Sequence, residues 1–240
     1  IDDILIALNE KRERISVLND YDSYLQKLEQ QLAKKEKELA QISDEVSEIR
    51  QRSAVKLVSE IKSALNDLNF LDVQFDMQFD RLPDYTANGI DAPEFLISTN
   101  PGEPLKPLGK VASGGELSRI MLGIKTIMAE NDHIESLIFD EIDSGISGRT
   151  AQMVSEKMNE LGRNHQIICI THLPQIAAMA DAHFLIEKAV ENKSTVSRIR
   201  RLTDNDSVAE LARMLGGAKI TDTVMESARE MKALAMEKKI

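Results

Sequence analysis

The sequence predicts an α/β lobe, with a mostly parallel sheet and flanking helices, that follows a long coiled-coil helix. Apolar residues recur at spacings of three, four and seven through the first 70 residues, which is the heptad pattern of a coiled coil. From Glu116 onward, short apolar runs alternate with amphipathic helical segments, as in parallel α/β sheets. The 240 residues, 42% of them hydrophobic, suffice for one core and an extension. We therefore expect a coiled-coil segment over residues 1–70 and the α/β lobe over residues 71–240.

The coiled-coil segment contains no glycine or proline, and its apolar residues are separated by glutamine, lysine and glutamate. The apolar stripe comprises Leu25, Leu28, Leu32, Leu39, Ile42, Val46 and Ile49. We expect a jog or turn at residues 19–22, where Asn-Asp-Tyr-Asp favours one. A heptad stripe has to be covered by a second helix, and no second long heptad segment occurs in the chain. Its partner is therefore another copy or an upstream segment; the alternative is a single helix lying on its own globular domain.

Changes of period predict the elements that follow. Alternating apolar and polar residues over 73–79 predict a strand, and residues 95–98 predict a second one. We expect loops over residues 81–93 and 100–110, where proline and glycine are concentrated. The α/β lobe is expected to have helices near 116–128, 150–161, 174–180, 207–215 and 223–238, and strands near 136–139, 166–170, 183–187 and 195–201.

Composition argues against a disulfide-bonded protein, a uniformly basic nucleic-acid-binding protein and a membrane protein. The single cysteine, Cys169, excludes an internal disulfide, and its apolar surroundings predict a buried structural thiol. A net charge of −10 argues against a uniformly basic nucleic-acid surface; Arg198 and Arg200 either form a local basic patch or only protect an edge strand. No apolar stretch approaches the ~20 residues that span a bilayer, and no signal peptide opens the chain. We expect a cytoplasmic protein without membrane association.

Two acids follow the apolar run 136–139. Asp140 and Glu141 come at the C-terminal end of a predicted strand, where α/β proteins place their ligands. Asp140 is predicted to hold Mg²⁺ against nucleotide phosphates, and Glu141 to polarise the attacking water as a general base. The alternative is an acid pair that caps a helix.

A glycine pair stands at a loop-to-helix junction, in the run Ser113-Gly114-Gly115-Glu116. Glycines let the backbone approach a phosphate closely, and the helix N-terminus supplies N–H groups and a positive dipole end. Ser113 can cap the helix and donate to a γ-phosphate. The alternative is an ordinary capped helix with Glu116 in its first turn. No G-x-x-x-x-G-K-[ST] phosphate loop occurs in the 240 residues.

Two further loops complete the candidate site. His172 follows the apolar run 166–170, and at that edge an imidazole could contact a γ-phosphate and hold the attacking water; the alternative is a lone loop histidine. Asp143, Ser144 and Gly145 open a glycine-containing loop after the acid pair. This loop could touch a second subunit near the nucleotide, or it is a plain strand-to-helix turn.

Spacing relates the motifs to each other. Ser113 lies 27 positions before Asp140, and His172 lies 32 positions after it; each interval holds one helix and one strand. We expect Asp140 and His172 at the same edge of neighbouring strands. We expect the Ser113 loop at the far end of a helix, too distant to serve the same nucleotide. ATP would then be sandwiched between the acids of one molecule and the Ser113 loop of another.

These motifs resemble the ABC ATPase superfamily, and within it a family of bacterial DNA repair proteins in the SMC-like branch. Residues 98–105, 112–119, 139–149 and 170–177 carry the resemblance. It implies the C-terminal lobe of an ABC-type ATPase head, with Ser113 to Glu116 as the signature. Asp140 would be the Walker B acid, Glu141 the catalytic base, the loop from Asp143 the D-loop, and His172 the H-loop histidine.

The resemblance further implies ATP hydrolysis with Mg²⁺, a homodimer through the heads, DNA as a partner in double-strand-break repair, and association with the nucleoid. The phosphate loop of this family lies in an N-terminal lobe before the coiled coil, and the chain departs from the family by lacking it. We therefore expect a partial ATPase, inactive without that lobe and its coiled-coil strand. The alternatives are the head of another SMC-type chromosome protein and a non-catalytic coiled-coil scaffold.

Overall fold

The computed structural model divides the chain into two compact units. The first unit comprises residues 1–55 and 79–93, and the second comprises residues 56–78 and 94–240. The structure describes residues 2–70, 72–111, 113–129, 133–191, 194–217 and 219–239.

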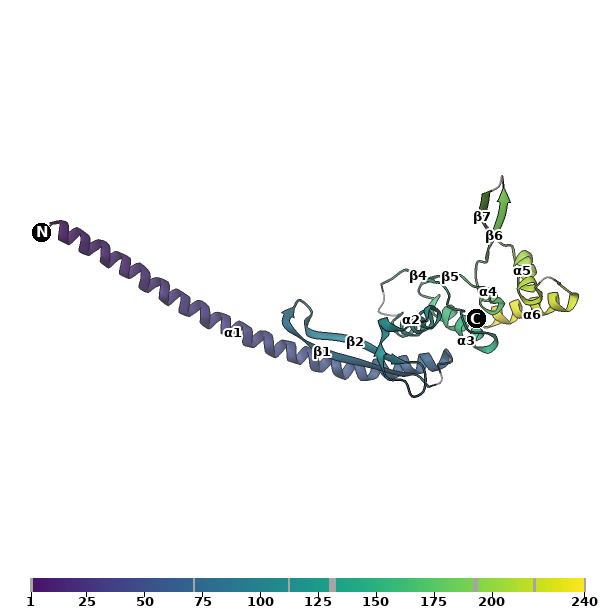
Figure 1. The fold of residues 1–240 in the computed structure, drawn as a ribbon, viewed down its shortest axis with the longest axis horizontal. Helices are drawn as coiled ribbons and strands as arrows, with labels where there is room; N and C mark the ends of the chain where they lie inside the picture. Colours follow the sequence, from purple (N-terminus) through teal and green to yellow (C-terminus); the bar gives the residue numbers. More distant parts are fainter. Residues whose placement is uncertain are drawn as a thin grey trace. The chain divides into compact units, whose positions relative to one another are not determined.

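Helix α1 runs without interruption from Asp2 to Asp67 (Figure 1). The jog expected at residues 19–22 is wrong. Turn-favouring residues each weaken a helix by less than about 1 kcal/mol, and the strong helix formers around them, with no glycine or proline, outweigh that cost. Except for half-buried Val46, the side chains of the heptad stripe are exposed, Leu32 and Ile42 each by 59%. That a second helix covers the stripe stays a prediction.

Strands β1 (Gln74–Thr86) and β2 (Gly89–Ser98) are neighbours in a sheet with β3 (Lys106–Pro107). The loop expected over residues 81–93 is therefore wrong, because both strands extend into it. Asn88 and Gly89 lie at the turn between them, and Gly89 has φ +93°. Asn-Gly is a strong hairpin signal because glycine adopts a positive φ without steric cost.

The core of the second unit forms around the last turns of α1. Ile61 and Leu65 are fully buried and Leu68 is 1% exposed. They lie in one apolar cluster with residues of α2 (Gly114–Met128). Gly123 of α2 permits close approach, since a Cβ atom there would lie 3.1 Å from Leu65 Cδ2. The domain boundary predicted at residue 70 stays a prediction, although the end of α1 lies in the second unit.

Strands β4 (Ser136–Phe139) and β5 (Gln166–Cys169) form a parallel pair, and α3 (Gly148–Leu161) connects them. Helix α3 packs on α2 and on the short α4 (Pro174–Ala178). The predicted α/β class, with a long helix before it, is confirmed. The parallel part is small, however, with two strands among the described residues.

One face of the β4–β5 pair is not covered. Leu137, Phe139 and Ile167 pack into the core, whereas Ile138 is 70% exposed and Ile168 46% exposed. Strands as apolar as these are typical of sheets covered on both faces, but here only one face of each strand is buried. In a strand, successive side chains point to opposite faces, so a covering layer on one side leaves the alternate residues in solvent.

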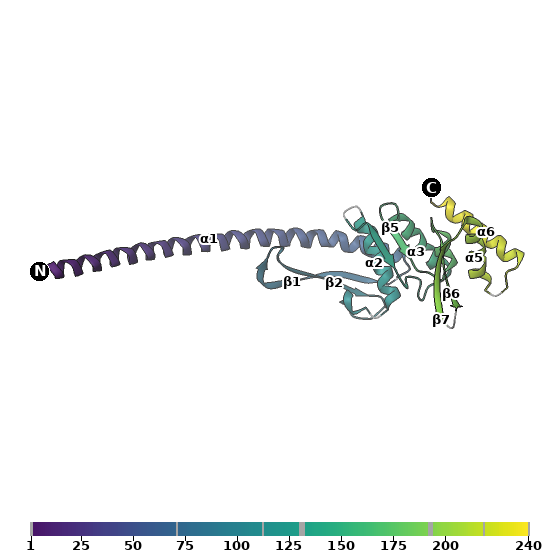
Figure 2. The same ribbon diagram turned by 90° about the horizontal axis from the view of Figure 1, so that it is seen from above.

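Strands β6 (Phe184–Glu191) and β7 (Ser194–Arg201) form an antiparallel hairpin, in a sheet separate from β4–β5 among the described residues (Figures 1 and 2). Helices α5 (Asp204–Gly216) and α6 (Asp222–Glu237) pack against each other and against α4. Lys232 of α6 donates to the carbonyls of Ala178 and Ala180 at the end of α4, at 3.0 and 3.2 Å. Within the part of the chain that the structure describes, no helix combines the length and apolarity needed to cross a bilayer.

The burial of Leu65 predicts a large loss of stability when it is truncated. Leu65→Ala should lower the free energy of unfolding by about 2–5 kcal/mol, because it removes apolar contacts and leaves a cavity. Val55, 73% exposed on the same helix, is the matched control, and Val55→Ala should change stability by no more than about 0.5 kcal/mol. Urea unfolding followed by circular dichroism measures both. Equal losses for the two variants would contradict the packing of α1 in the core.

Candidate nucleotide site

The carboxyl ends of β4 and β5 meet at one edge of the parallel pair. Phe139 and Cys169 are in register, and the N–H of Ile170 donates to the carbonyl of Phe139 at 3.0 Å. Asp140 follows β4 directly, and His172 lies three residues after the end of β5. Both are exposed, the His172 side chain by 71%. The structure thus brings these two residues to the same edge, as their spacing predicts.

Glu141 has an unusual backbone conformation beside Asp140. Its φ is +56°, in the left-handed region that costs a residue with a side chain about 1–2 kcal/mol. The N–H of Glu141 donates to Asp140 Oδ1 at 2.9 Å, so the turn is held locally. Both side chains are exposed. Strain that persists at an exposed acid is typical of a functional position.

The first turn of α2 lies against the loop that follows β4. Ser113 caps the helix, its Oγ accepting from the N–H of Glu116 at 3.4 Å. A Cβ atom on buried Gly115 would come within 2.8 Å of Ser144 Cβ and 2.9 Å of the Glu141 carbonyl oxygen. Gly115 is therefore required for packing. A Cβ on exposed Gly114 would meet only the flexible end of the Glu141 side chain, at 2.9 Å.

This arrangement corrects the position expected for the Ser113 loop. The loop does not lie at the far end from the acids but beside Glu141 of the same chain. The hydroxyl of Ser118, one turn into α2, donates to the Asp140 carbonyl at 3.0 Å. The physical reason is helix direction: a helix that leads into a parallel strand runs opposite to it, so the helix begins at the edge where the strand ends. The separation argument for a second molecule is therefore wrong.

Arg119 is a site residue that the motifs did not identify. Its guanidinium is buried and donates from Nη1 to the carbonyls of Ser144 and Ile142, at 2.8 and 3.3 Å. It also lies over the ring of Phe70, 5.5 Å from the centroid, and its burial lowers its pKa. The available signal was an arginine directly before the apolar run 120–122. Arg119 holds the loop after the acids in place.

Asp143 is buried, unlike the exposed Ser144 and Gly145 that follow it. Its Oδ2 accepts from Thr171 Oγ1 at 2.6 Å and from the His172 N–H at 2.8 Å. His172 Nδ1 lies 3.0 Å from the same oxygen. The structure therefore directs this carboxylate toward the residues after β5.

The exposed carboxylates of Asp140 and Glu141 are the groups at this edge that could contact a metal ion. Among the residues with described positions, no group of three or more His, Cys, Asp or Glu side chains could hold a metal ion. Magnesium in nucleotide sites needs only one or two carboxylates together with the phosphates, and exposed Asp140 fits that role. Cys169 is not a candidate ligand, because burial, with the charges of Asp143 and Asp140, raises the pKa of its thiol to about 12.

The strain at Glu141 makes a prediction about stability. Glu141→Gly should leave the chain as stable or up to about 1 kcal/mol more stable, because glycine adopts a positive φ freely. The matched control is Glu226→Gly in the exposed interior of α6, which should cost about 0.5–1 kcal/mol. Thermal unfolding of both variants measures the difference. A loss at position 141 as large as that at 226 would contradict the strained conformation.

Almost the whole chain is similar in sequence to known DNA repair proteins. No family model matches the chain. DNA repair protein RecN of Bacillus subtilis strain 168 is 41% identical over 246 residues, which cover 96% of this chain and 43% of that protein. DNA repair protein RecN of Halalkalibacterium halodurans is 39% identical over 98% of this chain and 42% of its own length.

Among solved structures, the fold is similar to the Smc head domain with a coiled coil and joint from Pyrococcus yayanosii. The TM-score is 0.49, with 20% identity over 68% of this chain and 29% of that one. The chain spans less than half the length of the curated relatives it matches. Identity near 40% over almost all of the chain confirms the resemblance drawn from the motifs, and the chain belongs to the RecN family of DNA repair proteins.

Proposed function

We propose that this chain is part of an ATPase head that binds ATP with Mg²⁺ and hydrolyses it, in a protein that repairs DNA double-strand breaks by recombination. The observation that carries the proposal is the shared edge, where exposed Asp140, Glu141 and His172 come together at the ends of two parallel strands. In α/β proteins this edge is where ligands bind. The relatives are named DNA repair proteins, which supports the cellular role.

Each residue at the edge has a distinct task in this proposal. Asp140 holds Mg²⁺ against the phosphates, and Glu141 accepts a proton from the attacking water. His172 contacts the γ-phosphate. Ser113, Gly114 and Glu116 form the signature at the start of α2, where N–H groups and the helix dipole favour an anion; Ser144 and Gly145 lie in the neighbouring D-loop.

We propose that the 240 residues alone do not hydrolyse ATP, and that a further lobe completes the head. They contain no phosphate loop. The exposed isoleucines on one face of the parallel pair, Ile138, Ile168 and Ile170, are what a docking lobe of the same protein would cover. The exposed heptad stripe of α1 similarly calls for a second coiled-coil strand. Relatives more than twice as long as this chain have room for both.

The signature is proposed to serve a nucleotide bound to a second head. Gly115 is in van der Waals contact with the Glu141–Ser144 loop, so no triphosphate fits between the signature and the acids of one molecule. The two motifs lie side by side instead. When two such edges face each other across a two-fold axis, the acids of each molecule meet the signature of the other. The proposed homodimer thus rests on the signature and the acids lying side by side in one molecule, and not on a long distance between them.

Mixing two inactive variants of the complete protein tests this arrangement. Glu141→Gln should slow hydrolysis by about 10²–10⁴-fold, because the general base is lost, and Ser113→Arg should block the signature. If sites form between heads, an equal mixture should regain about a quarter of wild-type turnover, since half of the dimers are mixed and each has one intact site. Steady-state phosphate release measures turnover, and Glu226→Gln is the neutral control.

Two outcomes would contradict the proposal. No recovery in the mixture would place both motifs on one nucleotide and overturn the two-head arrangement. Unchanged hydrolysis by Glu141→Gln alone would remove the catalytic assignment and favour a non-catalytic scaffold.

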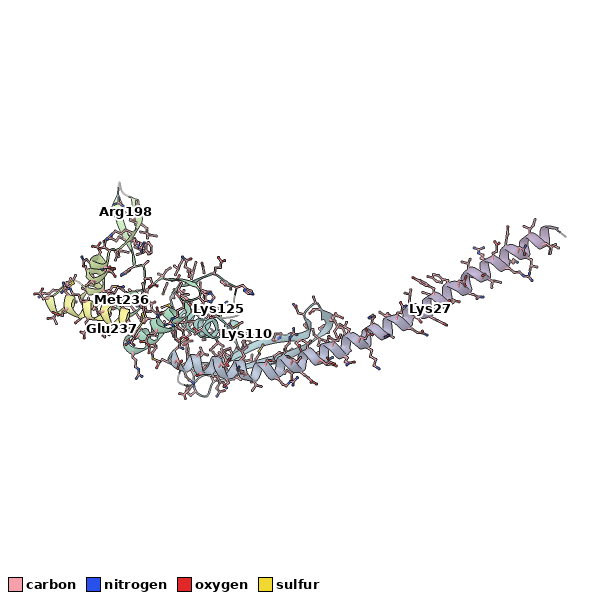
Figure 3. The ribbon with its side chains drawn as sticks, turned by 180° about the vertical axis from the view of Figure 1, so that it is seen from behind. Lys27, Lys110, Lys125, Arg198, Met236 and Glu237 are labelled. Carbon is pink, nitrogen blue, oxygen red and sulfur yellow. The ribbon has the colours of Figure 1, made fainter. Side chains whose placement is uncertain are left out.

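We propose that DNA binds a local basic surface on the β6–β7 hairpin, where Arg198 is labelled in Figure 3. Both Arg198 and Arg200 are exposed, and Arg200 Nε lies 3.5 Å from Glu187 Oε2, which offsets part of its charge. Two exposed arginines on one hairpin could contact DNA phosphates locally, although the net charge of the chain is −10.

The hairpin surface predicts a specific salt dependence. In the complete protein, Arg198→Ala with Arg200→Ala should weaken DNA binding and reduce the slope of log affinity against log salt by about 1–2, since each lost phosphate contact removes about 0.9. Exposed Arg163 in the loop after α3 provides the control substitution to alanine. Fluorescence anisotropy between low and moderate salt measures the slope. An unchanged slope would exclude the hairpin as the DNA surface.

A further inference from the structure

We propose that Asp143 is a positioning residue, which fixes the ring orientation and tautomer of His172 instead of contacting the nucleotide. The inference rests on the proposed function, because it concerns how His172 is presented to a γ-phosphate. Asp143 is 4% exposed, so its carboxylate is not available at the surface as a ligand for phosphate or metal. A buried charge of this kind has to be satisfied by donors within the protein.

Two donors and one ring nitrogen converge on a single oxygen of Asp143. The hydroxyl of Thr171 and the N–H of His172 donate to Oδ2, at 2.6 and 2.8 Å. These two bonds hold the backbone turn after β5. The third group, His172 Nδ1, lies 3.0 Å from the same oxygen, close enough for the carboxylate to attract a proton on that nitrogen. Hydrogen bonds accepted by a carboxylate are stronger than those between neutral groups.

The contact determines which ring nitrogen faces outward. A carboxylate accepts and cannot donate, so Nδ1 carries the proton in both the neutral and the protonated ring. Nε2 is then the nitrogen left for an outside partner, on a side chain that is 71% exposed. Acids that orient a catalytic histidine through Nδ1 act in this way. Without Asp143 the ring could rotate and exchange tautomers.

The carboxylate is itself held from the other side. Arg119 donates to the carbonyls of Ile142 and Ser144, the two residues flanking Asp143. Gly115 packs on the same loop. Helix α2 therefore contacts the loop after the acids, and Asp143 in that loop contacts the imidazole ring of His172.

Nuclear magnetic resonance of the chain with ¹⁵N-labelled histidine tests the tautomer directly. At alkaline pH, where imidazole is neutral, wild-type His172 should show the Nδ1–H form, and Asp143→Asn should shift it toward the Nε2–H form that free histidine prefers. His172→Gln assigns the resonances by removing them. An Nε2–H form in the wild type would overturn the proposal, and this measurement decides even if Asp143→Asn does not fold.

Kinetics of the complete protein test the consequence. Asp143→Asn should lower kcat by about 10- to 100-fold, with KM for ATP close to wild type, because outer partners of a catalytic group act through its orientation. Combining it with His172→Gln should be no worse than His172→Gln alone, since both changes remove one function. Additive losses would overturn the proposal, because Asp143 would then act independently of the ring. Exposed Asp181 supplies the control substitution, Asp181→Asn.

The two experiments distinguish failure of the inference from failure of the proposed function. If His172→Gln leaves hydrolysis intact while the tautomer changes as expected, the positioning by Asp143 stands and the catalytic role of His172 is lost. If the tautomer does not respond to Asp143→Asn, the positioning is wrong whatever the kinetics show.

Discussion

Close contact between the first turn of α2 and the loop after β4 determines the geometry of the whole edge. A methyl group at Gly115 would overlap Ser144 and the Glu141 carbonyl, so the glycine is needed for the two segments to meet. Once they meet, Arg119 can reach two carbonyls of that loop. The loop then holds Glu141 in its left-handed conformation and directs Asp143 toward His172.

The other side of α2 is packed on the end of the long helix. Gly123 lies against Leu65 and Leu68 of α1, and Arg119 lies over Phe70 just beyond its end. Helix α2 thus contacts both the last turns of α1 and the candidate catalytic edge. Because protein interiors are close-packed, the placement of α2 beside the edge depends on its contact with the end of α1.

The edge that carries Asp140 and His172 could be predicted from the sequence, because it depends on where two short strands end. Strand ends and interval lengths sufficed to bring Asp140 and His172 together. Interval lengths do not place the Ser113 loop, since its position depends on the direction of α2, which runs antiparallel to the strand that follows it. The extent of the β1–β2 hairpin was not predicted, because the prolines within residues 81–93 favour a loop. The hairpin signal in this segment is Asn88-Gly89. The role of Arg119 was out of reach, since it depends on carbonyls more than 20 residues away.

The exposed apolar surfaces depend on packing that alternation along a strand does not specify. Alternation over four residues shows that Leu137 and Ile138 face opposite ways, but not which layers cover them. Burying an isoleucine side chain contributes about 1.5–3 kcal/mol, so Ile138, Ile168 and Ile170 together offer a substantial driving force for a docking lobe. The heptad stripe of α1 offers further apolar side chains whose burial would stabilise a second coiled-coil strand. The exposed isoleucines and the exposed heptad positions of α1 are therefore the surfaces on which the proposed lobe and the proposed second coiled-coil strand would bury apolar area.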